Sequence, residues 1–184
     1  VLQSGLMSTG SVWFDNLRLR PSDAKDPVNL IATGDFEYAD ASGRPAGVTG
    51  NRTLVLLDNS RANTGYSSLL VKGVKDGETG FAFAPIGVEN FKPGQQVACS
   101  FYFFSDKQLR GTVLVELADA KGKVLSRRLA QAEFETSPNN WNGSSFVFKY
   151  ELTPEEASVK SIVVRVAANI KAGESIWFDS FVMR

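Results

Sequence analysis

The stretch Ser175-Ile-Trp-Phe-Asp-Ser-Phe-Val-Met-Arg184 ends the 184-residue sequence and decides how the rest of the chain is interpreted. Its β-branched and aromatic residues are typical of a β-strand. An acid, Asp179, lies in the middle of this apolar run. Because burying a carboxylate among large hydrophobic side chains is costly unless a partner binds it, the sequence predicts a closing strand in which Asp179 has a specific partner.

The same pattern occurs a second time near the start, as Ser11-Val-Trp-Phe-Asp-Asn-Leu-Arg-Leu-Arg20. The polar stretch that follows, Pro21-Ser-Asp-Ala-Lys-Asp-Pro27, has the composition of a linker. We therefore interpret residues 1–20 as the closing strand of a preceding module or as an extra edge strand. Residues 21–27 are then a linker, and residues 28–184 form one module. A lone apolar strand is expected to pair with a sheet edge.

Residues 28–184 contain about ten short strand-like segments separated by turn signals, which is typical of an all-β antiparallel sandwich or barrel. The segments expected to be strands cover residues 29–37, 53–57, 67–72, 79–84, 96–104, 112–117, 124–129, 145–152, 161–168 and 175–184. The stretch 154–158 favours a single helical turn. Alternation within each strand predicts one inner and one outer face.

Composition excludes several classes of function. Lysine plus arginine and aspartate plus glutamate both number 20, so the net charge is zero, which argues against nucleic-acid binding. The sequence contains no apolar run of about 18 residues, the length that would predict a membrane-spanning helix. Histidine is absent, which removes the commonest general base and the commonest transition-metal ligand. Carboxylate, hydroxyl and amide chemistry remains, together with oxygen ligation of hard cations. The single cysteine, Cys99, is expected to be a small buried hydrophobic residue.

Alternation places Tyr102, Glu116 and Arg165 on outer faces, and Phe104 on the same face as Tyr102. Sugar recognition uses such groups, because aromatic rings stack on the C–H faces of pyranoses and Arg, Glu or Asn side chains bond ring hydroxyls. Trp141 lies among amides in the stretch Ser137–Gly143, expected to be a loop. In the alternative interpretation, the outer polar side chains are only scattered residues on a solvated sheet, and Trp141 fills one end of the hydrophobic core.

Five motifs, in order, resemble those of the jelly-roll carbohydrate-binding modules appended to bacterial glycoside hydrolases. They are Asn29-Leu-Ile-Ala-Thr-Gly-Asp-Phe-Glu37, Asp40-Ala-Ser-Gly-Arg-Pro-Ala-Gly47, Thr64-Gly-Tyr-Ser-Ser-Leu69, Phe91-Lys-Pro-Gly-Gln-Gln-Val97 and Trp177-Phe-Asp-Ser-Phe181. The resemblance implies a jelly-roll β-sandwich with two facing sheets. Val48 stands where the family usually has a tryptophan, so a loop aromatic of the family is missing here.

The resemblance also implies a structural calcium ion where the opening and closing strands meet. Its ligands would be the Glu37 carboxylate, backbone oxygens around Asp35 and Tyr66, and the side chain and carbonyl of Asp179. Mixed carboxylate and carbonyl oxygens are what a hard cation prefers, and Asp58 could add a ligand from its loop. In the alternative, Asp179 caps a β-bulge by accepting backbone N–H groups.

In modules of this kind a ligand lies on the concave face of one sheet or in loops at the rim of the sandwich. The resemblance then implies Tyr102, Glu116 and Arg165, with Phe104, for the concave face, and Trp141 for the rim.

The expected function is that of a non-catalytic, secreted or cell-surface bacterial module. It would bind polysaccharide or oligosaccharide and carry a linked enzyme to it, with neighbouring modules of the same polypeptide as further partners. The alternative is a structural or adhesion spacer without a sugar ligand, which the repeated closing strand and the linker also favour. A glycosidase would need two carboxyl groups about 5–5.5 Å apart in the retaining case, and no Glu-x-Asp-x-x-Glu arrangement occurs; we therefore expect no enzyme.

Overall fold

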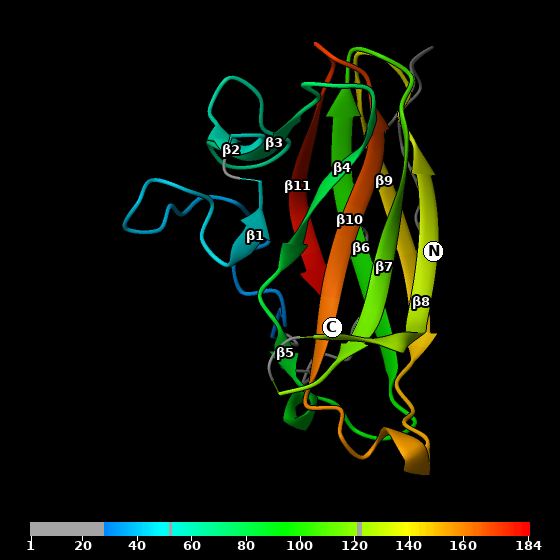
Figure 1. The fold of residues 1–184 in the computed structure, drawn as a ribbon. Coiled ribbons are helices and arrows are strands. Elements are labelled where there is room, and N and C mark those ends of the chain that lie inside the picture. The colour runs from blue at the N-terminus through cyan, green and yellow to red at the C-terminus, as the bar shows by residue number, and fades with distance from the viewer. Residues whose placement is uncertain (1–27, 52, 121–122) are drawn as a thin grey trace, which may run out of the picture.

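Two antiparallel sheets face each other across a hydrophobic core (Figure 1). The structure is a computed structural model that describes residues 28–184 except residues 52 and 121–122. The stretches 1–20 and 21–27, for which the sequence predicts an edge strand and a linker, lie outside the described residues. The predicted all-β sandwich is confirmed.

The first sheet has the strand order β1-β4-β10-β7-β8, and β5 pairs with β10 beside it. Its strands are β1 (Val48–Gly50), β4 (Gly77–Phe83), β5 (Ile86–Gly87), β7 (Arg110–Ala118), β8 (Val124–Glu135) and β10 (Ser161–Ile170). The second sheet has the order β2-β3-β11-β6-β9. Its strands are β2 (Val55–Asp58), β3 (Ser68–Lys72), β6 (Gln96–Ser105), β9 (Asn140–Lys149) and β11 (Ser175–Met183). Two short 3₁₀ turns, η1 (Val88–Asn90) and η2 (Pro154–Glu156), complete the described elements.

Phenylalanine rings from both sheets fill the core. Phe101 and Phe181 stack with their ring centroids 4.7 Å apart, and Phe81 meets the edge of Phe178 at 5.4 Å. All four rings are at most 3% exposed. Since each buried phenylalanine contributes roughly 1.5–3 kcal/mol relative to an exposed one, this cluster contributes strongly to holding the two sheets together.

The closing strand β11 lies in the middle of the second sheet, between β3 and β6. Its register shifts between Asp179 and Val182, and Ser180 has a positive φ of 52°. This β-bulge lets Phe178 and Phe181, three residues apart, both enter the core.

The opening stretch contacts β11 without forming the strand expected over residues 29–37, so that expectation is wrong. Leu30 donates its backbone N–H to the Met183 carbonyl (2.9 Å), and Phe181 donates to the Gly34 carbonyl (2.7 Å). The Asn29 amide donates to the Phe181 carbonyl (2.9 Å) and accepts from the Met183 N–H (2.9 Å). Side-chain bonds and turns replace a regular ladder because the bulge interrupts the strand that the stretch would pair with.

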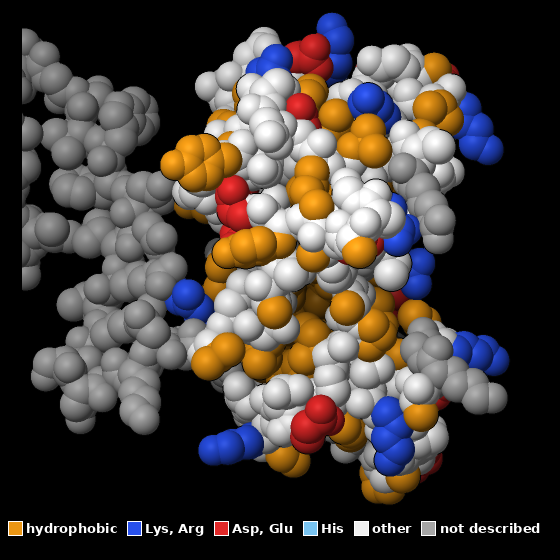
Figure 2. Space-filling model, turned by 90° about the vertical axis from the view of Figure 1, so that its left-hand side faces the viewer, with side chains coloured by type: hydrophobic (Ala, Val, Ile, Leu, Met, Phe, Trp, Pro, Cys, Tyr) orange, Lys and Arg blue, Asp and Glu red, His pale blue; other side chains and the backbone are white. Residues whose placement is uncertain are grey.

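Figure 2 shows the side of the molecule that carries β1 and β2, where hydrophobic side chains gather in a hollow. A pocket of about 300 Å³ on the described surface is lined by Leu30, Ile31, Phe83 and Ile86, among others, and lies where the opening stretch packs against β5. Within the described residues, no helix is long and apolar enough to cross a membrane.

Candidate functional site

The five residues predicted to bind a ligand separate onto two opposite faces of the sandwich. Glu116 and Arg165 lie on β7 and β10 in the first sheet, whereas Tyr102, Phe104 and Trp141 lie on β6 and β9 in the second. All of them face away from the core. The expected single concave site that combines Tyr102 with Glu116 and Arg165 is therefore not formed, because consecutive strands β6 and β7 belong to different sheets and their outer faces point in opposite directions.

On the first sheet, Glu116 is clamped between two arginines. Its Oε2 accepts the Arg165 Nε–H at 3.0 Å, and its Oε1 lies 3.7 Å from the Arg128 Nε. Glu116 is only 6% exposed, while the two arginine side chains are about half exposed. A buried carboxylate needs such pairing. Glu116 is therefore a positioning residue, and the arginines are the groups that a ligand can reach.

Beside this clamp, a transverse trough crosses the outer face of the first sheet. Its floor is the cross-strand row Gly80–Ala167–Thr112–Glu133, in which the first three side chains are small or absent. Longer side chains flank it, with Arg165 on one side and the row Glu78–Asn169–Arg110–Glu135 on the other. Two hollows of about 310 and 640 Å³ lie consecutively along this row.

Strand packing keeps the trough floor low. A Cβ added at Gly80 would lie 1.9 Å from the Val166 carbonyl oxygen of β10, so the close approach of the two strands admits only glycine there. The trough can hydrogen-bond a polyhydroxyl ligand through carboxylate, amide and guanidinium groups. It offers little stacking, since the two aromatic residues among those lining the hollows, Phe81 and Phe134, are buried.

The second sheet presents an aromatic cluster on its outer face. Phe104 lies between Trp141 and Trp177, with ring centroids at 5.7 and 5.8 Å. The Arg61 guanidinium lies over Phe104, 4.6 Å from its centroid, and 5.0 Å from that of Trp177. Phe104 is only 6% exposed, so it supports the tryptophans rather than offering a free face.

Trp141 does not plug the core. It belongs to β9 rather than to the loop expected around it, because that strand begins at Asn140, and it packs half-buried against Phe104. Sequence reasoning missed Trp177 and Arg61 as members of the cluster. Alternation with the buried Phe178 is a signal that could have placed Trp177 on this face, whereas Arg61 comes from a loop and carries no such signal.

Asp58, proposed as an additional calcium ligand, lies against the aromatic cluster. Its Oδ2 accepts the Trp177 indole N–H at 2.5 Å and the Ser60 hydroxyl at 2.6 Å. Partial burial works to raise the pKa of Asp58, but these hydrogen bonds, with help from the Arg61 charge, outweigh it and lower the pKa below its usual value.

Two of the predicted calcium ligands bind the backbone of one loop, residues 59–67. Asp179 is fully buried; its Oδ2 accepts the N–H groups of Asn63 (2.7 Å) and Thr64 (2.9 Å), and its Oδ1 accepts the N–H and hydroxyl of Ser180 (2.6 and 3.3 Å). Glu37 Oε1 accepts the N–H groups of Tyr66 (2.8 Å) and Ser67 (3.1 Å). Burial raises the pKa of Asp179, and the hydrogen bonds oppose that rise.

These contacts decide how well calcium fits the expected ligands. A carboxylate has about four lone-pair positions, and all four of Asp179 and two of Glu37 accept hydrogen bonds. Asp35 is exposed, and its Oδ1 accepts only a long bond of 3.5 Å from the Glu37 N–H. Among the described residues no group of three or more acidic or cysteine side chains could hold a metal ion. A cation would have to displace N–H donors, so calcium stays a prediction from the resemblance.

Comparison with known structures shows that several carbohydrate-binding modules have a similar fold. The chain is similar to the CBM22-1 xylan-binding domain of Paenibacillus barcinonensis Xyn10C, with 18% identity, a TM-score of 0.61, and 88% of this chain and 96% of that one covered. It is also similar to TmCBM61 in complex with β-1,4-galactotriose (16% identity, TM-score 0.59, 86% and 99% covered). The C-terminal family 22 module of Clostridium thermocellum Xyn10B gives 19% identity, a TM-score of 0.54, and 83% and 94% covered.

No protein-family model and no curated protein matches the sequence. At identities below 20% the structural likeness establishes the fold, and the expected jelly-roll architecture of such modules is thereby confirmed.

Proposed function

We propose that the chain is a non-catalytic carbohydrate-binding module whose ligand lies in the transverse trough of the first sheet. The observation that carries this proposal is the run of small residues Gly80–Ala167–Thr112, which lies between Arg165 on one side and a row of hydrogen-bonding side chains on the other. Carboxylate, amide and guanidinium groups along this row can bond successive hydroxyls of a sugar chain. The fold similarity supports the class of ligand.

Catalysis is not part of this proposal. Two of the glutamates that could serve as an acid–base pair are held in ion pairs: Glu116 with Arg165 and Arg128, and Glu135 with Arg110 (3.3 Å). We further propose that the module is secreted or lies on a bacterial cell surface, where it carries a linked enzyme to polysaccharide.

A binding assay tests the trough. Xylan and β-1,4-galactan are the first probes, because similar modules are named for xylan binding or contain β-1,4-galactotriose. The double variant Glu78→Ala/Asn169→Ala removes two exposed flanking groups and should lower affinity at least tenfold for the ligand in the trough. The control Glu89→Ala removes an exposed acid from η1, outside the trough, and should leave affinity unchanged. Equal affinity of the wild type and the double variant would contradict the trough assignment.

The competing function is a structural spacer without a sugar ligand. The absence of an exposed aromatic ring among the residues that line the trough favours it, because stacking contributes strongly to sugar affinity. If the wild-type protein binds none of a broad panel of soluble and insoluble polysaccharides, the result would favour the structural spacer.

A further inference from the structure

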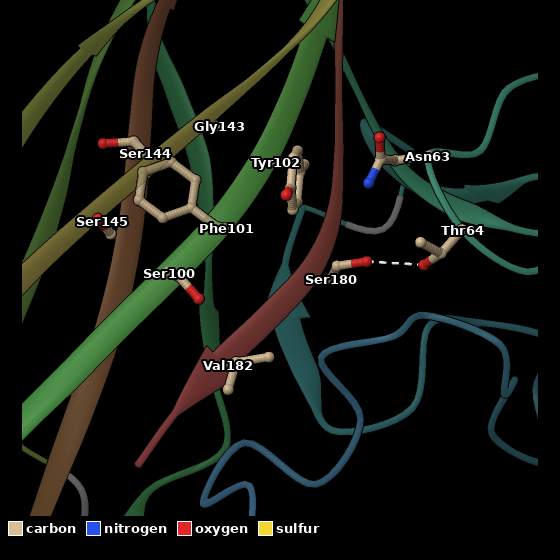
Figure 3. A pocket seen from close by; sticks show the side chains of 10 residues that line it. All are labelled: Asn63, Thr64, Ser100, Phe101, Tyr102, Gly143, Ser144, Ser145, Ser180 and Val182. Carbon is tan, nitrogen blue, oxygen red and sulfur yellow. Dashed lines mark hydrogen bonds between the residues drawn. The ribbon is translucent and has the colours of Figure 1, made fainter. Parts of the chain in front are cut away.

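A second groove lies on the opposite side of the sandwich, on the outer face of the second sheet (Figure 3). It runs over β9, β6 and β11, is bounded by loop 59–67, and has a volume of about 320 Å³. Its lining contains hydroxyls from all three strands and from the loop, among them those of Ser100, Tyr102, Ser145, Ser180 and Thr64. No residue that lines it carries a charged side chain.

Three features shape the floor of this groove. Tyr102 lies opposite Gly143, and Ser100 lies opposite Ser145, in the β6–β9 register. A Cβ added at Gly143 would lie 3.2 Å from the Tyr102 Cε1, so the tyrosine ring leans over the space that glycine leaves free. Two residues further along, or about 7 Å, Trp141 lies opposite the buried Phe104 on the same outer face.

The wall of the groove is held in place before any ligand arrives. The Thr64 and Ser180 hydroxyls meet at 2.7 Å between the loop and β11, as the dashed line in Figure 3 shows. Beneath them, Asp179 accepts the N–H groups of Asn63 and Thr64. A ligand would therefore meet a preorganised wall and would not have to order the loop, which lowers the entropic cost of binding.

We propose that this groove is a second binding site, for a neutral glycan chain. Neutral hydroxyls and an amide can exchange hydrogen bonds with sugar hydroxyls, while Tyr102 in the groove and the half-buried Trp141 beside it offer ring surface to pyranose C–H groups. An anionic ligand would find no positive side chain among the lining residues, and a cation would find no negative one. The inference shares the ligand class of the proposed function but does not depend on the trough.

The two sites cannot serve one glycan segment. Their sheets are packed face to face, about 10 Å apart, and each site faces outward. A module with both sites is bivalent, and it can hold two chains at once or bind an insoluble surface with increased avidity.

Isothermal titration with neutral β-1,4-linked oligosaccharides tests the groove. Ser145→Arg places a long side chain into the groove from an exposed position. Val147→Arg makes the same change two residues along β9, at an exposed residue outside the groove, and is the matched control. We expect two oligosaccharides per wild-type chain, one for Ser145→Arg, two for Val147→Arg, and one for Glu78→Ala/Asn169→Ala. Unchanged melting temperatures would show that each variant is folded.

The outcomes separate the two sites. If Ser145→Arg binds with the stoichiometry and affinity of the wild type, the groove is not a binding site, and the assignment of the trough is unaffected. If Ser145→Arg removes all binding while the trough variant binds like wild type, the trough fails and the groove is retained. A wild-type chain that binds no oligosaccharide overturns both assignments.

Discussion

At the scale of single residues, Asp179 illustrates how one buried carboxylate organises its surroundings. It cannot be solvated, and it accepts four hydrogen bonds, three of them from backbone N–H groups. The cost of burying its charge is offset by these donors. In return, Asp179 links β11 to a loop that is 115 or more residues earlier in the sequence.

Replacing Asp179 with alanine should leave the N–H groups of Asn63, Thr64 and Ser180 without their acceptor. We expect a loss of about 1–3 kcal/mol in the free energy of unfolding, because buried donors lose their partner. Urea denaturation measures it. Tyr66→Ala, which removes an exposed ring from the same loop, is the control and should cost much less. An equal loss in both variants would show that Asp179 has no special role.

The lowered pKa of Asp58 predicts that the stability of the protein depends on pH. Its pKa is lower in the folded chain than its usual value, so the folded state binds the proton less readily than the unfolded state. The stabilisation from Asp58 is therefore present above the unfolded pKa of about 3.9 and is lost as the pH falls through the folded pKa. The melting temperature of wild type should exceed that of Asp58→Asn at pH 7, and the difference should shrink on acidification. A constant difference down to pH 2 would contradict this role.

At the scale of elements, loop 59–67 is built by contacts that no local pattern describes. Glu37 and Asp179 bind its backbone at two places, and Ser68 donates its hydroxyl to the Arg61 carbonyl (2.6 Å). The loop forms a wall of the groove and places Arg61 over Phe104 and Trp177. Two carboxylates from distant parts of the chain therefore hold the backbone of this loop in place.

This gives a prediction about calcium. If backbone N–H groups are the native partners of Glu37 and Asp179, the melting temperature should be the same with calcium as with 5 mM EDTA. The calcium concentration should be about 10³ times a typical micromolar Kd, because binding at that ratio would raise the free energy of unfolding by about 4 kcal/mol. Differential scanning calorimetry measures this. A clear calcium-dependent rise that disappears in Glu37→Gln would instead establish the metal site implied by the resemblance.

At the scale of the whole molecule, the two-sheet architecture sets how many ligands the chain can bind. Tyr102 and Arg165 are both outer-face residues, yet they belong to different sheets and point to opposite sides. A flat partner such as a polysaccharide fibre can contact one side at a time, so the trough and the groove act as separate sites.

Bivalency predicts cross-linking. Mixed with a soluble, high-molecular-mass neutral polysaccharide that it binds, the wild-type protein should increase light scattering, with a maximum near equal numbers of protein molecules and chain sites. Ser145→Arg should bind the same polysaccharide without that increase, and Val147→Arg should behave as wild type. Equal scattering from Ser145→Arg and wild type would rule out cross-linking through the groove.

The sequence by itself determined most of the strands and their inner faces, because alternation is a local property that burial enforces; the strand expected over residues 29–37 was the exception. It placed Val97, Cys99, Phe101 and Phe103 on one face, and all four are buried. It also identified Asp179 as a carboxylate that needs a partner. Only the tertiary structure decided which strands share a sheet, and so which outer residues meet, because strand order depends on pairing between distant segments. The bulge at Ser180, the path of loop 59–67 and the two grooves arise from those long-range contacts, which no short stretch of sequence encodes.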